Sequence, residues 1–302
     1  MITLLSSQML NENDPILRDI QKLTKGLFKE IGWHYYVDIL WVIKMLQSQN
    51  IQPGSTIVDA GAGNGLLQFV LSLYGYNVIS VDFSPRKFNI LERMFFNFGT
   101  INTGAKFSHT YISHISEISS VKNKTKRLLH MVCKGRLNPI SVGKFVFRRY
   151  SSKSKPGKII LYQADIRKMS EISSASIDAV VSISAIEHMQ VNSINGAIQE
   201  FMRILKVDKP MIVTTSASKS SDWYHQPSEG WCFSLKTISL MFNLENCDGT
   251  EFRQFDNIMA DYKENSFLRK KLASVYFISD KNGMPRGVWN PQYIPVGIVK
   301  NR

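Results

Sequence analysis

Short apolar runs alternate along the chain with segments whose apolar residues recur at helical spacing. The runs predict buried strands at 57–58, 78–82, 159–161, 178–184 and 211–215. Helical spacing follows several of them, most clearly at 66–74 and 194–205. The run at 178–184 is mainly apolar, which is typical of a strand buried on both faces of a sheet. The alternation predicts an α/β fold with a mostly parallel sheet and helices on both faces.

The two ends of the chain are less regular. Asp14-Pro15 is a typical helix start, and a second helix is expected after the aromatic cluster 33–36. Residues 1–50 are therefore predicted to form a helical cap, in which these aromatic residues pack between helices; a ligand contact through His34 or Tyr35 is the alternative. Ser84-Pro85 predicts a helix that ends at Gly99. The last two strands of the sheet are expected between about 251 and 278.

Composition limits the class of protein. The chain has 302 residues, of which 44% are hydrophobic and 20% charged, and it is long enough for a sizeable core. No apolar run approaches the roughly 20 residues of a membrane span. The N-terminus lacks the features of a signal peptide, so a cytoplasmic location is expected. Three scattered cysteines without a CxxC pair predict reduced thiols and no zinc site.

Nearly all of the net charge of +13 comes from one segment. Twelve Lys or Arg residues lie between Lys122 and Lys158, and no Asp or Glu occurs between Glu117 and Asp165. We expect an inserted basic subdomain at 105–157 that divides the main domain into 51–104 and 158–302. A solvated lid is one interpretation. The others are a docking surface for RNA or another polyanion, for an acidic carrier protein, or for an anionic membrane surface.

A glycine loop follows the first predicted strand, in the sequence Asp59-Ala-Gly61-Ala-Gly63-Asn-Gly65. A dinucleotide fingerprint requires a sixth-position glycine, and Leu66 occupies that position. Asp59, just before the glycines, would repel a pyrophosphate but suits a cationic ligand such as S-adenosylmethionine (SAM). Asp82 ends the next strand, where its two oxygens can accept hydrogen bonds from ribose hydroxyls.

Four segments resemble class I SAM-dependent methyltransferases, in the small-molecule branch of that family. The glycine loop is similar to motif I, Val81-Asp82-Phe83-Ser84 to the ribose-binding acid, 163–166 to the adenine-binding acid, and 178–188 to the fourth strand with its Glu-His end. The resemblance implies a Rossmann-like doubly wound sheet with an antiparallel final strand. It also implies SAM as cofactor. The residues it implies for cofactor binding are Asp59, Gly61, Gly63, Asp82, Phe83, Asp165, Ile166, Ser184 and Glu187.

Methyl transfer requires no metal, and none is expected, but a group must accept a proton from the methyl acceptor. His188 follows the fourth strand directly and is the first candidate for this base. His225 lies in a later loop with Tyr224 and Glu229, and is the second. We expect methylation at oxygen or nitrogen of a small or carrier-linked molecule. The alternatives are methylation of RNA or another polyanion through the basic segment, and a non-catalytic SAM-binding module.

Overall fold

The structure is a computed structural model that describes residues 1–86, 88–101, 156–244, 249, 251–272 and 288–302. The predicted insertion, except for its last two residues, lies outside these ranges, as do Cys133 and Cys247. Cys232 is a buried free thiol. None of the helices described combines the length and apolar character needed to cross a lipid bilayer.

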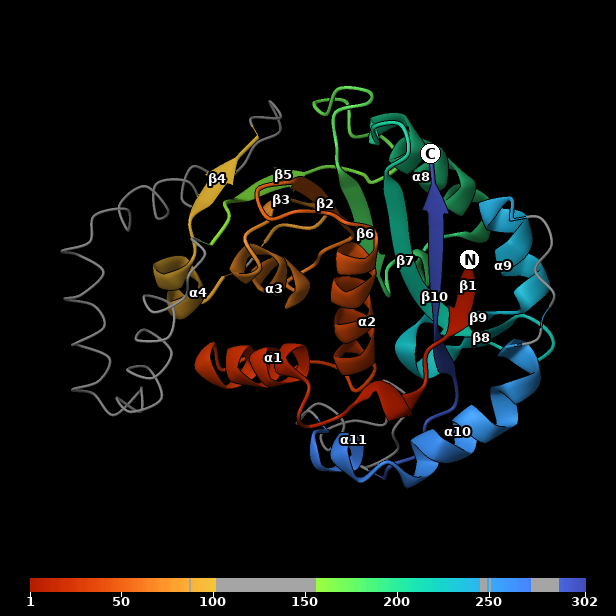
Figure 1. The fold of residues 1–302 in the computed structure, drawn as a ribbon. Helices are drawn as coiled ribbons and strands as arrows, with labels where there is room; N and C mark the ends of the chain where they lie inside the picture. The colour runs from red at the N-terminus through yellow and green to blue at the C-terminus, as the bar shows by residue number, and fades with distance from the viewer. Residues whose placement is uncertain (87, 102–155, 245–248, 250, 273–287) are drawn as a thin grey trace, which may run out of the picture.

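The centre of the molecule is one twisted sheet (Figure 1). Its strands lie in the order β1-β10-β7-β6-β2-β3-β5-β4. In chain order they are β1 Ile2–Leu4, β2 Thr56–Ala60, β3 Asn77–Asp82, β4 Phe98–Thr100, β5 Ile159–Gln163, β6 Ala179–Ile183, β7 Pro210–Ala217 and β10 Ile294–Asn301. A hairpin of β8 Trp223–His225 and β9 Gly230–Phe233 joins the end of β7.

Along the sheet from β7 through β6, β2, β3 and β5 to β4, each strand is parallel to the next. In contrast, β10 is antiparallel to β7. The predicted mixed sheet with an antiparallel last strand is therefore confirmed. Chain order reverses on either side of β2, and the crevice outside the carboxyl ends of the strands at such a switch point is where open α/β sheets bind ligands.

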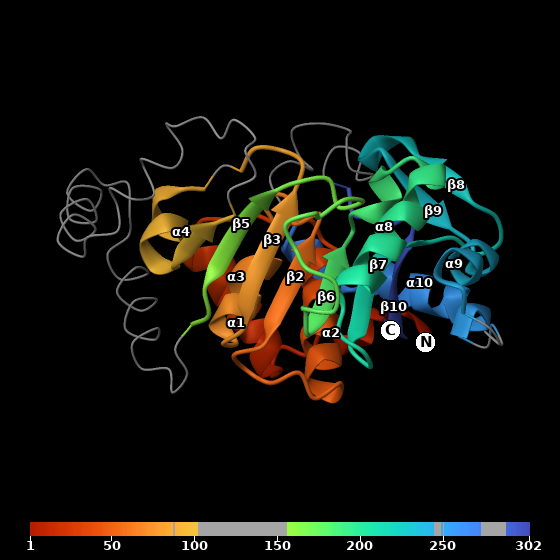
Figure 2. The ribbon, with the colours of Figure 1, turned by 90° about the horizontal axis from the view of Figure 1, so that it is seen from above.

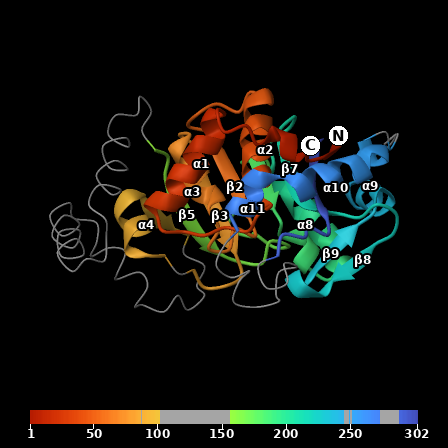
Figure 3. The same cartoon turned by 90° about the horizontal axis from the view of Figure 1, so that it is seen from below.

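Helices cover both faces of the sheet (Figure 2). On one face lie α1 Pro15–Gly26, α2 Tyr35–Ser48 and α3 Leu67–Leu73, as the view from below also shows (Figure 3), and α8 Val191–Ile204 lies on the other. The remaining helices are α4 Ile90–Phe95, α9 Leu235–Phe242, α10 Phe255–Glu264 and α11 Ser266–Lys270, with short 3-10 turns η1 Ser7–Met9, η2 Ile186–His188, η3 Gln226–Ser228 and η4 Glu251–Gln254.

The first helix begins as its sequence predicts. Asp14 caps α1, because its Oδ1 accepts hydrogen bonds from the backbone N–H groups of Ile16 and Leu17.

In α2 nine residues are buried, so this helix is hydrophobic almost all round and lies inside the fold. A Cβ on Gly297 of β10 would meet the Trp41 ring at 2.4 Å, so glycine there lets α2 approach the sheet.

Two predictions about the elements are wrong. Helices α10 and α11, not strands, occupy the described part of the range 251–278, while residues 273–278 lie outside the described residues. The last two positions at that end of the sheet are filled by β10 and by β1 from the N-terminus, which pair with each other. The helix expected from Ser84-Pro85 begins only at Ile90, where Asn89 and Glu92 form a capping box. Ser84 instead donates its backbone N–H to Asp82, and Phe98 lies in β4 beside β5.

Candidate functional site

The glycine loop between β2 and α3 is fixed by its neighbours. Gly61 and Gly63 have φ angles of +74° and +46°, in the region where residues with a side chain are strained. A Cβ on Gly61 would lie 2.5 Å from the Cβ of Ala185, so this position also lacks space for a side chain. The backbone N–H groups of Gly61 and Ala62 both donate to the carbonyl of Val81. The loop is thus held against the end of β3.

Asp82 completes this attachment. Its Oδ2 accepts a hydrogen bond of 2.8 Å from Gly63 N, and its Oδ1 accepts one of 2.8 Å from Ser84 N. Each carboxylate oxygen keeps capacity for a second donor. Asp82 therefore organises the loop and can still accept hydrogen bonds from the hydroxyl groups of a ligand.

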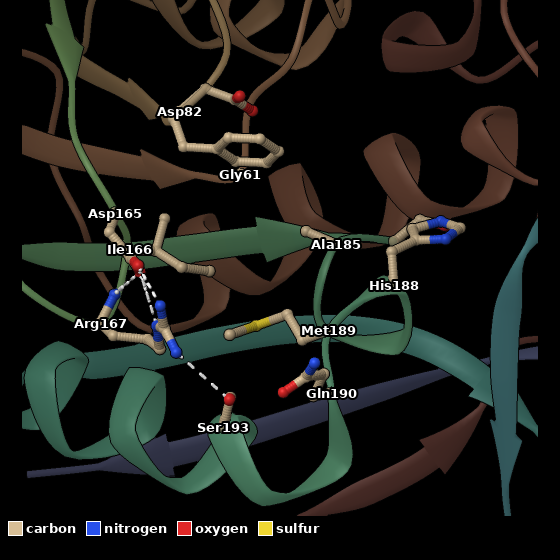
Figure 4. Close-up of a pocket in the computed structure, with 12 residues that line it drawn as sticks. Gly61, Asp82, Asp165, Ile166, Arg167, Ala185, His188, Met189, Gln190 and Ser193 are labelled. Carbon is tan, nitrogen blue, oxygen red and sulfur yellow. Dashed lines mark hydrogen bonds and ion pairs between the residues drawn. The ribbon is translucent and has the colours of Figure 1, made fainter.

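A cavity of about 540 Å³ opens at the carboxyl ends of β2, β3, β5 and β6 (Figure 4). This volume lies in the range of small-molecule and cofactor sites. Asp165 and Arg167 lie at one end of the view and His188 at the other. The cavity is lined by Gly61, Asp82, Phe83, Asp165, Ile166, Arg167, Ser184, Ala185, His188, Met189, Gln190 and Ser193.

Of the predicted site residues, seven line this cavity. Phe83 is 77% exposed there, an unusual position for a large aromatic ring without a ligand. Asp59, Gly63, Glu187 and His225 do not belong to the lining. Gly63 and Glu187 lie next to the lining, because Gly63 donates to Asp82 and Glu187 accepts from Ser184. Asp59 precedes the lining residue Gly61 by two positions in the chain.

Five cavity residues were not predicted from the sequence, namely Arg167, Ala185, Met189, Gln190 and Ser193. Arg167 is the charged one among them. Its guanidinium pairs with both oxygens of Asp165, with Nε at 3.0 Å from Oδ1 and 2.9 Å from Oδ2, and its backbone N–H donates to Oδ1 at 2.8 Å. The Arg167 hydrogen bonds lower the pKa of Asp165. An arginine two residues after an acid at a strand end was the available signal. The carboxylate predicted to bind adenine is thus already occupied by a neighbouring side chain.

The turn after β6 is held by a buried acid. Ser184, at φ +46°, donates its hydroxyl to Glu187 Oε1 at 2.7 Å, and Thr215 donates to Oε2 at 3.1 Å. Glu187 is 2% exposed, and burial raises its pKa. It therefore ties β6, β7 and the η2 turn together rather than pointing into the cavity.

His188 is exposed at the end of the cavity and has a defined orientation. Its Nδ1 lies 2.9 Å from the carbonyl oxygen of Glu229. A carbonyl only accepts, so Nδ1 carries the proton and Nε2 of the neutral ring is a proton acceptor. Glu229 presents that carbonyl from a left-handed backbone conformation, with φ +52°.

His225 lies in a different environment. It is 1% exposed and packs between Trp223 and Tyr293, each at 5.4 Å between ring centroids. Its Nδ1 pairs with Ser228 Oγ at 2.6 Å, whereas Nε2 has no partner with hydrogen-bond geometry among the residues that the structure describes. Burial lowers the pKa of His225, and the nearby Gln292 side chain acts in the opposite direction. This neutral, enclosed ring does not reach the cavity.

Asp59 is the most unusual acid of the site. It is 1% exposed, and neither carboxylate oxygen has a hydrogen-bond partner among the described residues. Burial raises its pKa to about 7, with Arg86 opposing and Asp82 adding to the shift. A buried carboxylate without donors is costly, so it favours a cationic or hydrogen-bonding ligand group nearby.

The arrangement fits the adenosyl cofactor that the motifs imply, with one qualification. The glycine cradle, the ribose-type acid Asp82 and the orphaned Asp59 carboxylate suit SAM, whereas Asp165 must exchange its arginine partner before it can bind adenine. In the described part of the chain, no three His, Cys, Asp or Glu side chains are grouped so as to hold a metal ion.

Comparison with known proteins gives a family match and a fold likeness. Residues 144–213 match the family described as methyltransferase domain. A comparison with curated proteins gives no match. Among solved structures, SpnF, a (4+2)-cyclase, is 11% identical, with 98% of this chain and 96% of that chain covered and a TM-score of 0.47.

Two further structures are methyltransferases by name. The 1,6-didemethyltoxoflavin-N1-methyltransferase of Burkholderia thailandensis, with bound 1,6-didemethyltoxoflavin and S-adenosylhomocysteine, is 10% identical, covering 88% of this chain and 79% of that chain at a TM-score of 0.43. A SAM-dependent methyltransferase of Methanosarcina mazei is 13% identical, covering 66% and 82% at a TM-score of 0.37.

The family match spans β5, β6, α8 and the first half of β7, the part of the chain that forms one side of the cavity. This part of the chain is therefore similar to a methyltransferase domain, and the doubly wound mixed sheet around it agrees with the fold that the family resemblance implies.

Proposed function

We propose that the protein transfers the methyl group of SAM to oxygen or nitrogen of a small or carrier-linked metabolite, by in-line displacement with His188 as general base. The observation that carries the proposal is the single cavity that is lined by both Asp82 and His188, together with the Glu229 contact at Nδ1 that leaves Nε2 of the neutral His188 ring as the proton acceptor. Of the two candidate bases, we choose His188, and the absence of His225 from the cavity lining supports this choice.

The cofactor roles follow the positions of the residues. Asp82 would accept the ribose hydroxyls, and Gly61 and Gly63 give the backbone close approach to the ligand. Ile166 and Phe83 offer apolar surface in the cavity, while Ser184 and Glu187 support the turn beside it. When bound, SAM supplies an electrophilic methyl group on a positively charged sulfur.

The hydrogen bond of His188 selects the tautomer of the neutral ring that a base requires. Its Nδ1–H is engaged by the Glu229 carbonyl, so Nε2 can take a proton from an attacking hydroxyl or amine. The buried Glu187 keeps the η2 turn, and with it the His188 backbone, attached to β6 and β7 through Ser184 and Thr215. A positioned base of this kind contributes roughly 10²-fold to 10⁴-fold in rate.

The cavity volume favours an acceptor of small size or a small group on a carrier. A polyanion, an acidic carrier protein or an anionic membrane remains a prediction from the basic segment 122–158, because its residues up to 155 lie outside the described part of the chain. A non-catalytic SAM-binding role is disfavoured by the oriented imidazole at the end of the cavity.

Titration calorimetry tests the proposal directly. The protein should bind SAM and S-adenosylhomocysteine, and NADH should not compete. Tritiated SAM with a panel of hydroxyl and amine acceptors should then reveal methyl transfer. Binding of NADH in place of both sulfur compounds would contradict the assignment at its first step.

A further inference from the structure

Four polar side chains are buried together beneath the glycine loop. Asp59 of β2 and Ser80 of β3 are register partners in the parallel ladder, so their side chains share one face of the sheet. Gln68 comes from α3 on that face, and Arg86 from the segment after β3. Asp59, Gln68, Ser80 and Arg86 are 1%, 0%, 0% and 5% exposed. Such a group is unusual in a core and requires its own hydrogen bonds.

Three hydrogen bonds connect this buried cluster to the loop. Arg86 Nη2 donates to Ser80 Oγ at 2.6 Å, Ser80 Oγ donates to Gln68 Oε1 at 2.9 Å, and Gln68 Nε2 donates to the carbonyl of Gly65 at 3.0 Å. In this chain of bonds, Ser80 accepts from Arg86 and donates to Gln68, and Gln68 accepts from Ser80 and donates to the loop. The position of the last loop glycine is therefore linked to the guanidinium of Arg86, which follows β3 in the chain.

The cluster also carries charge. Asp59 has no hydrogen-bond partner among the described residues, and the charged groups that act on it are Arg86 and Asp82. Arg86 favours the ionised carboxylate, whereas burial and Asp82 disfavour it. Without the Arg86 charge, burial and the Asp82 charge remain, and both favour the protonated form of Asp59. A protonated Asp59 would lose its attraction for a ligand ammonium.

We propose that Arg86 is a positioning residue of the cofactor site, which fixes the glycine loop through Ser80 and Gln68 and supplies the positive charge beside the Asp59 carboxylate. This inference rests on the proposed function, because it assumes that the cationic ligand of the loop is SAM. Arg86 itself does not line the cavity.

The test is the pH dependence of S-adenosylhomocysteine binding to the full-length protein, measured by calorimetry from about pH 6 to 9. The wild type should bind more tightly as pH rises through about 7, where Asp59 ionises. Arg86→Met should raise the midpoint of this curve by about one pH unit and weaken binding at neutral pH about tenfold. Ser80→Ala interrupts only the link to the loop, so it should weaken binding without moving the midpoint.

Arg203→Met is the matched control. Arg203 also makes several hydrogen bonds, to Glu200 and to the carbonyls of Met169 and Ile172, none of which lines the cavity. It should change neither affinity nor midpoint. Circular dichroism checks that each variant is folded. If Arg86→Met does not fold, Ser80→Ala still tests the link between Arg86 and the glycine loop.

The outcomes separate the two proposals. A wild type that binds no S-adenosylhomocysteine refutes the proposed function itself. A wild type that binds it, together with a folded Arg86→Met variant whose midpoint and affinity are unchanged, refutes the role of Arg86 alone. Unchanged affinity in Ser80→Ala refutes the link to the glycine loop.

Discussion

Asp82 Oδ2 accepts a hydrogen bond of 2.8 Å from the backbone N–H of Gly63, 19 residues earlier in the chain. The acid that ends β3 and the loop that follows β2 are thereby one structural unit. The residue predicted to bind ribose also determines the shape of the loop that would surround the rest of the cofactor.

Asp82→Ala should therefore reduce both stability and cofactor binding. Loss of the two charge-assisted bonds to Gly63 and Ser84 should lower the free energy of unfolding by roughly 2 kcal/mol, and S-adenosylhomocysteine affinity should fall at least about tenfold. Urea unfolding and calorimetry measure the two effects.

Asp178→Ala is the control for this change. Asp178 also accepts a backbone N–H, from Thr56 at 2.8 Å, and pairs with Lys206, but it precedes β6 and lies outside the cavity lining. Its loss should lower stability while leaving affinity unchanged. Equal losses of affinity in both variants would mean that Asp82 acts only through stability.

Arg167→Ala should strengthen cofactor binding modestly. Arg167 occupies both oxygens of Asp165, which the family resemblance assigns to adenine. The pair is half-exposed, so exchange of its partner costs little and we expect a gain of about twofold to fivefold in S-adenosylhomocysteine affinity. Weaker binding in the variant would indicate that the guanidinium itself contacts the ligand.

The stability of the ligand-free protein should depend on Asp59. Burial raises the pKa of this acid to about 7 in the folded state, above its ordinary value of 3.8. Between these values the folded protein holds a proton that the unfolded chain has released, so the Asp59 contribution to stability is present at lower pH and is lost as pH rises to about 7.

Asp59→Asn removes the titrating carboxyl group and with it the pH dependence of stability that this group causes. Relative to wild type, the variant should gain in free energy of unfolding between about pH 4 and 7, as measured by urea denaturation at several pH values. The same variant should lose the rise of S-adenosylhomocysteine affinity across neutral pH. Parallel stability curves for the two proteins would contradict the raised pKa.

His188→Gln should impair turnover rather than cofactor binding. The amide cannot accept and later release a proton, so the rate with an accepted substrate should fall roughly 10²-fold to 10⁴-fold, while S-adenosylhomocysteine affinity stays within about twofold. Single-turnover methyl transfer from tritiated SAM provides the measurement.

His225→Gln provides the contrast. His225 is buried among aromatic rings and bonded to Ser228, so its replacement should lower the melting temperature, with a smaller effect on the rate of the folded enzyme. If His225→Gln stops turnover in a stable protein and His188→Gln does not, the assignment of the base is wrong.

Much of the fold could be predicted because the signals are local. The apolar runs gave the strands β2, β3, β5, β6 and β7, and Asp14 marked the start of α1 through bonds two and three residues away. Edge strands carry weaker signals. β1 has three residues, and β10 lies nearly 300 residues further along the chain, so their pairing is a long-range contact that spacing does not reveal.

The sequence by itself determined the alternation of strands and helices, the glycine loop and the acids at the strand ends, because hydrophobic period and turn chemistry act within a few residues. Only the tertiary structure decided that Arg167 engages Asp165, that Glu229 orients His188 from 41 residues away, and that Arg86 reaches Gly65 through Ser80 and Gln68. These contacts depend on rotamer and on long-range packing, and a side chain's partner cannot be deduced from its position in the chain.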